Sequence, residues 1–119
     1  MHTSFNSLGA TMPMNMRRRY SFFAPDAETV SDIKRICALW AWAKENWGDG
    51  GPYLFWDRFC AAAAFFAPLA SRFMTYGILI DAPSEACISA LLSHSVTEAF
   101  YRDAKAETWV MDHNELDID

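Results

Sequence analysis

The fold of this chain is decided by residues 53–80, which read YLFWDRFCAAAAFFAPLASRFMTYGILI. The charged side chains in this stretch are Asp57, Arg58 and Arg72, and aromatic and small apolar residues dominate the rest. A segment this apolar belongs in the centre of a small helical domain or against another chain. The sequence therefore predicts an all-α fold built around this stretch.

The composition fits one folded domain. The chain has 119 residues, of which 52% are hydrophobic and 15% aromatic, and this length suits a single core. Its 5 tryptophans and 9 phenylalanines exceed the usual need of so small a core. We therefore expect some rings at the surface or at a contact between chains, where aromatic residues are enriched.

Charge is unevenly distributed along the chain. The net charge is −5, and the acidic residues concentrate after residue 60. An acidic half is repelled by a phosphate backbone, which argues against an extended nucleic-acid interface. The exception is the basic cluster Arg17, Arg18 and Arg19, which is either a solvated arm or a grip for an acidic group.

Cysteine usage and hydropathy indicate a cytoplasmic protein. Cys37, Cys60 and Cys87 are isolated, without the CxxC pair of a zinc or redox site, and unpaired thiols are typical of a reducing compartment. The start of the chain lacks the pattern of a secretory signal. The longest uncharged run of the apolar stretch, residues 59–71, is shorter than the about 20 residues that span a bilayer, so no membrane segment is expected.

Start and stop signals predict three principal helices. Pro25 and Asp26 begin the first helix, and the glycine-rich run 48–51 ends it. Pro68 breaks the second helix. The predicted helices cover residues 26–47, 52–76 and 83–108.

These elements imply three parts of the chain. Residues 1–24 form a flexible or partner-ordered arm, because they lack a helical period. Residues 25–111 form a single helical domain, a small irregular bundle. Residues 112–119 form an acidic tail.

Trp42 is the residue that we expect to bind a partner. At 100° per residue it points about 160° away from Trp40, so both rings cannot enter one core. An exposed tryptophan beside an apolar residue and an arginine is typical of a binding hot spot. The alternative is that the second helix and the arm cover Trp42. The predicted partner-binding residues are Arg35, Leu39, Trp42 and Asn46, together with Arg17, Arg18 and Arg19.

The last predicted helix carries the one cluster of side chains that could bind a metal or take part in catalysis. Cys87, His94 and Glu98 share one flank of that helix, and His94 and Glu98 are four residues apart. Zinc needs three or four protein ligands, so Cys60, Asp81 or His113 would have to join them. The simpler interpretation is an ordinary surface pair, worth a few tenths of a kcal/mol. The sequence therefore predicts no cofactor and no metal.

Together these features predict a non-enzymatic protein–protein interaction module, an inhibitor or adaptor that blocks a macromolecular partner. The Cys, Ser and His residues have no spacing that unites a nucleophile with a base. Compact acidic proteins are common among inhibitors encoded by phages and mobile elements, including anti-CRISPR proteins, and this analogy of size and charge sets the expected class. Homodimerisation through the first or second helix is part of the expectation.

Two other functions stay open. The first is a small-molecule or metal-binding helical protein, or a small enzyme, that uses Cys87, His94 and Glu98. The second and weaker one is a DNA-binding regulator with the arginine cluster as its arm.

Overall fold

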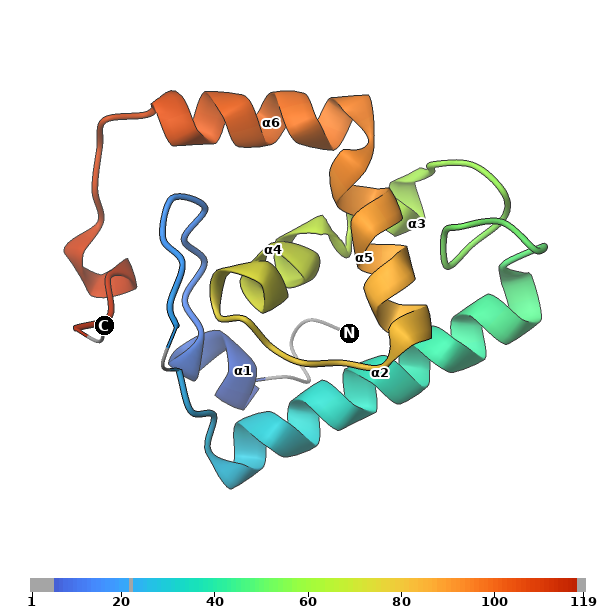
Figure 1. Ribbon diagram of the computed structural model, residues 1–119, viewed down its shortest axis with the longest axis horizontal. Helices are drawn as coiled ribbons and strands as arrows, with labels where there is room; N and C mark the ends of the chain where they lie inside the picture. The colour runs from blue at the N-terminus through green and yellow to red at the C-terminus, as the bar shows by residue number, and fades with distance from the viewer. Residues whose placement is uncertain (1–5, 22, 118–119) are drawn as a thin grey trace.

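The computed structural model describes residues 6–21 and 23–117, the first two of them by their backbone alone. Residues 1–5 and 22 of the predicted arm and residues 118–119 of the predicted acidic tail lie outside these ranges. All regular elements of the described residues are helical, which confirms the predicted all-α class (Figure 1). The elements are α1 (Asn6–Thr11), α2 (Ala27–Trp47), α3 (Ala61–Ala64), α4 (Ala67–Thr75), α5 (Ala82–Ser93), α6 (Ser95–Ala106) and the 3-10 turn η2 (Asp112–Asn114).

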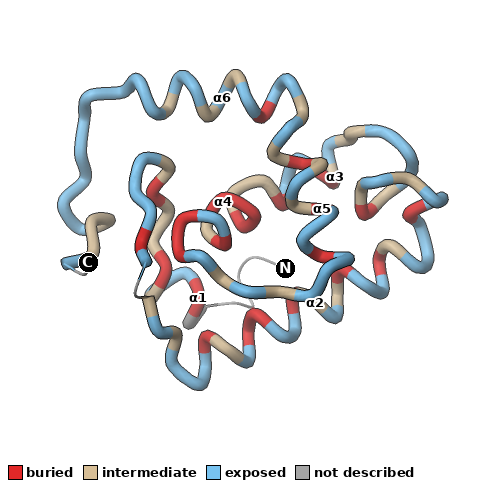
Figure 2. The backbone as a smooth tube through the Cα atoms, viewed as in Figure 1, coloured by how far each residue is buried: buried red, intermediate tan, exposed pale blue. Residues whose placement is uncertain are grey.

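Helix α4 is the centre of the fold. The other helices surround it, and Figure 2 shows its buried residues at the middle of the molecule. Pro68 lies in its first turn, where a missing backbone N–H is tolerated. The break expected at this proline is thus the start of a new helix. The buried residues of α4 are Leu69, Ala70, Ser71, Phe73 and Thr75.

Helix α2 has nearly the predicted length and joins the core through Trp40. Asp26 caps its start, because the Asp26 carboxylate accepts a hydrogen bond from the Thr29 amide at 2.8 Å. This bond lowers the pKa of Asp26. The Trp40 ring packs against Phe66 and Phe73, with centroid distances of 5.8 Å to each.

Residues 52–60 are not helical, and in this part the prediction of a helix over 52–76 is wrong. The backbone amide of Trp56 donates to the carbonyl oxygen of Trp47 at 2.6 Å. This contact satisfies one of the acceptors that the end of α2 leaves open. Aromatic residues are only moderate helix formers. The hydrogen bond between Trp56 and Trp47 therefore outweighs the helical tendency of residues 52–60, and the next helix begins at Ala61.

The third predicted helix, over 83–108, is divided into α5 and α6, which run in different directions (Figure 1). His94 has an extended backbone, and its Nδ1 accepts a hydrogen bond from the Val96 amide at 3.3 Å. The His94 ring also stacks on Phe59, with centroids 4.0 Å apart. A side chain that caps a new helix competes with continuation of the old one, which explains the break.

Part of the expected N-terminal arm lies in the core. The Tyr76 hydroxyl donates to the Pro13 carbonyl oxygen, and the Thr75 hydroxyl donates to that of Asn15, both at 2.7 Å. These bonds hold the segment against α4, so the packed body begins well before residue 25. The buried residues of the segment are Leu8, Met12, Asn15 and Tyr20.

Helix α6 lies at the edge of the molecule. Thr97 is its one buried residue, while Val96 and Phe100 are each about three-fifths exposed (61% and 62%). The radius of gyration is 14.3 Å, against about 13.5 Å for a domain of this length. The described chain is therefore compact, with α6 as its least buried long helix.

We predict that Tyr76→Phe changes the dependence of stability on pH. Burial raises the pKa of Tyr76 to about 12, whereas an unfolded tyrosine ionises near pH 10. In the folded state Tyr76 therefore keeps its proton between pH 10 and 12, whereas in the unfolded state it loses it. The contribution of Tyr76 to the free energy of unfolding is fully present below pH 10 and decreases as the pH rises toward 12.

In Tyr76→Phe this decline should be shallower. The variant should also lose about 1 kcal/mol at pH 7, because the bond to Pro13 is gone. Urea denaturation from pH 7 to 12 measures both effects. Tyr53→Phe is the control, since the Tyr53 hydroxyl makes no hydrogen bond with the described residues. Equal slopes for wild type and Tyr76→Phe would contradict the assignment.

Candidate functional site

The predicted contrast between Trp40 and Trp42 is confirmed. Trp40 is 2% exposed and Trp42 is 52% exposed. The stripe around Trp42 faces outward, with Arg35 and Asn46 exposed and Leu39 half-buried. The Asn46 amide donates to the Trp42 carbonyl oxygen at 2.8 Å, which fixes its side chain along the helix.

Trp42 is one end of a chain of aromatic contacts, which we call the aromatic row. Its members are Trp42, Trp47, Phe55 and Trp56. Trp42 and Trp47 meet edge to face with centroids 4.7 Å apart, Trp47 stacks on Phe55 at 6.1 Å, and Phe55 contacts Trp56 at 6.2 Å. Trp47 is 45% exposed and Trp56 is 52% exposed. The row therefore joins the end of α2 to the loop that follows it.

The loop of residues 48–58 places the second half of the row. The bond from the Trp56 amide to Trp47 closes the loop at its base. Gly51 is needed inside it, because a Cβ at this position would lie 2.8 Å from the Trp56 carbonyl oxygen and would also clash with Asp57. The loop is thus a closed unit that returns its aromatic end to the helix from which it started.

Trp56 holds a backbone conformation that suits few residues. Its φ is 58°, in the left-handed region that costs a non-glycine residue roughly 1–2 kcal/mol. A bulky side chain there is rare, and such strained residues cluster at binding sites. The fold thus tolerates strain to keep an exposed indole in the row.

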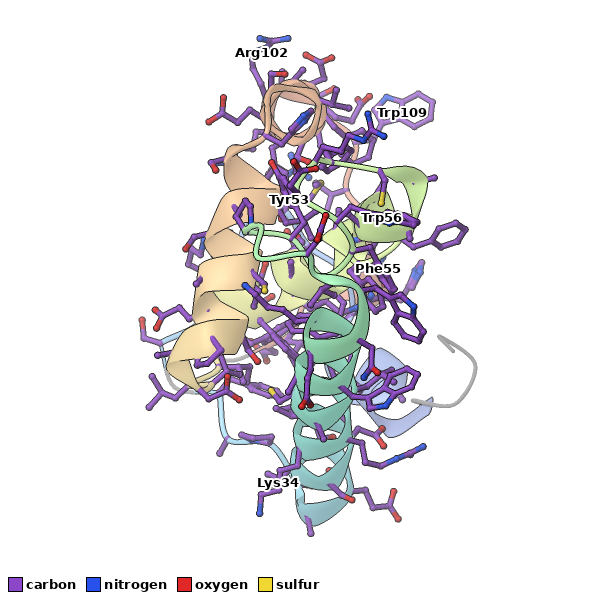
Figure 3. The ribbon with its side chains drawn as sticks, turned by 90° about the vertical axis from the view of Figure 1, so that its right-hand side faces the viewer. Lys34, Tyr53, Phe55, Trp56, Arg102 and Trp109 are labelled. Carbon is purple, nitrogen blue, oxygen red and sulfur yellow. The ribbon has the colours of Figure 1, made fainter. Side chains whose placement is uncertain are left out.

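Trp109 points the same way as the end of the row but is carried by a distant part of the molecule. In Figure 3, Phe55, Trp56 and Trp109 all point to the right, although the segments that carry them are far apart in the sequence. Trp109 is 84% exposed. In Figure 1, however, the loop after α2 lies at the right of the molecule and the segment after α6 lies at its left, so Trp109 is not part of the surface around the row.

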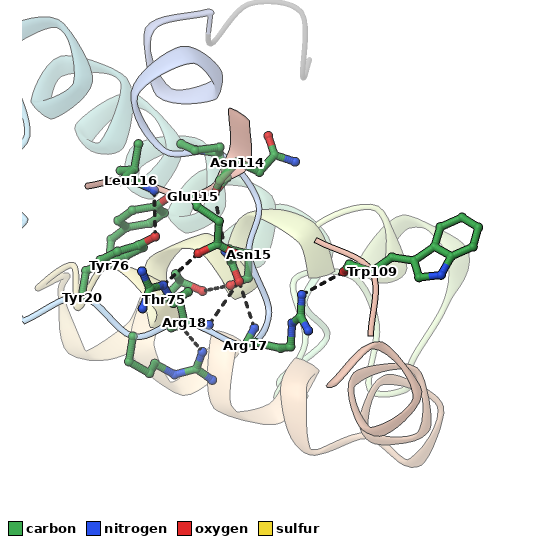
Figure 4. Close-up of polar contacts among 12 residues, drawn as sticks. Asn15, Arg17, Arg18, Tyr20, Thr75, Tyr76, Trp109, Asn114, Glu115 and Leu116 are labelled. Carbon is green, nitrogen blue, oxygen red and sulfur yellow. Dashed lines mark hydrogen bonds and ion pairs between the residues drawn. The ribbon is translucent and has the colours of Figure 1, made fainter. Parts of the chain in front are cut away.

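The arginine cluster holds the C-terminal segment (Figure 4). The Arg17 guanidinium donates to the carbonyl oxygens of Glu107 and Trp109, each at 2.9 Å. Arg18 pairs with Glu115 at 2.8 Å, and this carboxylate raises the pKa of Arg18 together with the larger effect of Tyr20. The structure thus gives Arg17 and Arg18 internal partners.

The third arginine also contacts the chain itself. Arg19 donates to the Arg18 carbonyl oxygen at 2.7 Å and to the Met74 sulfur at 3.0 Å. The predicted partner-binding residues therefore fall into two separate groups, the Trp42 stripe on α2 and the arginines beside the C-terminal segment.

The residues of the metal or enzyme alternative have separate structural surroundings. Cys87 is buried and accepts a hydrogen bond from the Lys44 ammonium at 3.5 Å. His94 caps α6, and Asp81 caps α5 by accepting from the Ser84 amide at 2.8 Å. Across residues 6–21 and 23–117, no three His, Cys, Asp or Glu side chains could together hold a metal ion.

A second apolar feature lies beneath α6. A groove of about 270 Å³ runs between this helix and the start of α4. Its walls are mainly apolar and include Met14, Met16, Phe59 and Phe100. The groove explains why Val96 and Phe100 are exposed, since the body of the protein does not close against that face of α6.

Sequence reasoning missed most of the aromatic row. It placed Trp47 at the end of a first helix over 26–47 and Phe55 and Trp56 inside a second helix over 52–76, and it singled out Trp42 alone for binding. The missed signal is the glycine-rich run 48–51 followed directly by Pro52 and aromatic residues. Such a run permits a closed loop, and a closed loop redirects every ring that follows it.

No protein-family model, curated protein or solved structure matches the chain. Within the described residues, no helix combines the length and apolar character needed to cross a bilayer. The candidate site therefore rests on the geometry of this molecule.

We predict that Trp56→Gly is more stable than Trp56→Ala. Both variants remove the exposed ring, but glycine adopts positive φ without steric strain. The free energy of unfolding should differ by about 1 kcal/mol in favour of glycine. Denaturant titrations of the two variants measure it, and a lower stability for Trp56→Gly would show that the left-handed conformation is not strained in solution.

We also predict that Glu115→Gln loosens the C-terminal segment. The change weakens the contact with Arg18, and the Leu116 amide, which donates to the Tyr20 hydroxyl at 3.1 Å, should exchange faster. Hydrogen exchange monitored by NMR measures this amide. Asp103→Asn is the matched control, because Asp103 is an exposed carboxylate on α6, and equal exchange in the two variants would contradict the role of Glu115.

Proposed function

We propose that the protein is a non-enzymatic interaction module that binds a macromolecular partner through the aromatic row. The observation that carries the proposal is the continuous contact from Trp42 to Trp56, with three tryptophans about half exposed. Tryptophan is the residue type most enriched in binding hot spots. In a solitary chain these rings would remain in water.

The size of the row supports a macromolecular partner. If a tryptophan offers up to about 250 Å², the exposed fractions of the three indoles leave up to roughly 370 Å² of mostly apolar surface in water. Apolar patches of about 300–600 Å² on monomers are often functional. A standard interface buries about 800 Å² on each side, so the row would form its centre and the polar residues around it would form the rim.

The strained loop supports a role for Trp56 in particular. Its conformation costs stability, and neither the packing of the core nor the cap of α2 needs an indole at this position. A ring kept exposed at such a cost is best explained by a contact outside the chain.

The proposed mode of action is blocking. A module of 119 residues with a net charge of −5 acts by covering the surface of its partner or by linking it to another protein. We place it with the small acidic inhibitors that phages and mobile elements encode, anti-CRISPR proteins included, and this placement rests on size and charge alone.

Affinity capture with matched variants tests the proposal. The wild type, Trp42→Ala/Trp56→Ala and Trp109→Ala are immobilised in equal amounts, and bound proteins are identified and then purified. We predict that the purified partner binds the double variant at least 10-fold more weakly, as expected for hot-spot residues that each contribute about 2 kcal/mol. Trp109→Ala should bind like the wild type.

The outcome that contradicts the proposal is equally clear. If a partner binds the wild type and the double variant with the same affinity, the aromatic row is not the binding site. Circular dichroism and thermal unfolding of each variant show whether the helices are intact, so that lost binding is not a consequence of unfolding.

A further inference from the structure

We infer that the aromatic row binds a positively charged, arginine-bearing segment of a protein. The inference rests on the proposed function and adds the chemistry of the partner. It combines two properties of the same surface, which are exposed indole rings and unpaired carboxylates beside them.

Three carboxylates accompany the row. Glu45 lies one helical turn after Trp42, a spacing that places the two side chains next to each other on the surface. Asp49 and Asp57 belong to the loop of residues 48–58, and Asp57 directly follows Trp56. All three carboxylates are exposed, and none forms an ion pair or side-chain hydrogen bond with another described residue.

The positive charges of this region do not balance the carboxylates. The basic residues between Trp42 and Arg58 are Lys44 and Arg58 itself. Lys44 is half-buried and donates to the Cys87 sulfur, so its ammonium is directed toward α5. Arg35, two turns before Trp42 on the same stripe, pairs with Asp32 at 3.6 Å. The surface around the row thus carries three unpaired carboxylates against the exposed guanidinium of Arg58 and that of the paired Arg35.

The rings of the row suit the same kind of partner. Tryptophan binds cations over its face more strongly than the other aromatic residues do, and arginine also stacks on such faces. Among the described residues, the cation–ring contacts found involve tyrosines away from the row, with Arg18 5.7 Å from the centre of the Tyr20 ring and Lys105 5.9 Å from that of Tyr101. An incoming arginine would meet an indole face and a carboxylate at the same place.

Other occupants fit this surface less well. A nucleic acid or an anionic membrane would bring negative charge toward Glu45, Asp49 and Asp57. A second copy bound through the same face would bring two sets of these carboxylates together, because a two-fold contact pairs identical surfaces. A basic protein segment is the occupant that the charges favour.

A fluorescently labelled peptide of nine arginines is the probe for this inference. Its binding to the full chain is followed by fluorescence anisotropy at low and at physiological salt, beside a peptide of nine lysines. We expect saturable binding, with the arginine peptide at least 3-fold tighter than the lysine peptide. Trp56→Ala should weaken binding of the arginine peptide about 10-fold, while Trp109→Ala should leave it unchanged.

Charge variants distinguish the effect of the carboxylates beside the row on peptide binding from the effect of the net charge of the chain. Asp49→Asn/Asp57→Asn should weaken binding 3- to 10-fold and reduce its dependence on salt. Asp103→Asn/Asp112→Asn removes the same number of charges away from the row and should have little effect. Binding that falls equally in both double variants would show attraction to the acidic chain as a whole, and would overturn the inference.

Three further outcomes would overturn it. The first is that the arginine peptide shows no saturable binding at low salt. The second is that both peptides bind with equal affinity and Trp56→Ala has no effect. The third is that light scattering shows a dimer that Trp42→Ala dissociates. If affinity capture finds a partner that needs Trp42 and Trp56 but presents an acidic or uncharged surface, only this inference fails. If captured partners ignore both tryptophans, the proposed function fails as well.

Discussion

The contact of Trp40 with Phe66 and Phe73 is the interaction on which the rest of the structure depends. It fixes α2 against the segment that leads into α4 and against α4 itself. Burial of an indole removes up to about 250 Å² from water, worth about 6 kcal/mol at about 25 cal/mol per Å². The Trp40 Nε1 is buried without a hydrogen-bond partner among the described residues, which costs about 1–3 kcal/mol, so the packing of the ring outweighs the loss.

The sequence predicted the parts of the fold that local signals determine. The start signal at Asp26 and the glycine-rich run 48–51 placed α2 within a residue of its observed ends, and Pro68 marked the start of α4. The outward direction of Trp42 followed from helical geometry alone. The all-α class followed from the same patterns.

Two boundaries could not be predicted because tertiary contacts decide them. The Trp56 amide reaches back to Trp47, and a helical wheel of residues 52–60 contains no trace of that bond. His94 ends α5 while its ring stacks on Phe59 from a distant part of the chain. The aromatic row was missed for the same reason, since two of its four rings, Phe55 and Trp56, depend on the path of one loop.

The grip of Arg17 on the C-terminal segment has an evolutionary consequence. Its guanidinium donates to two main-chain carbonyl oxygens, so these hydrogen bonds do not depend on which side chains occupy positions 107 and 109. Substitutions there can accumulate without releasing the segment. The residue at position 109 can therefore vary during evolution while Arg17 keeps the backbone of this segment in place.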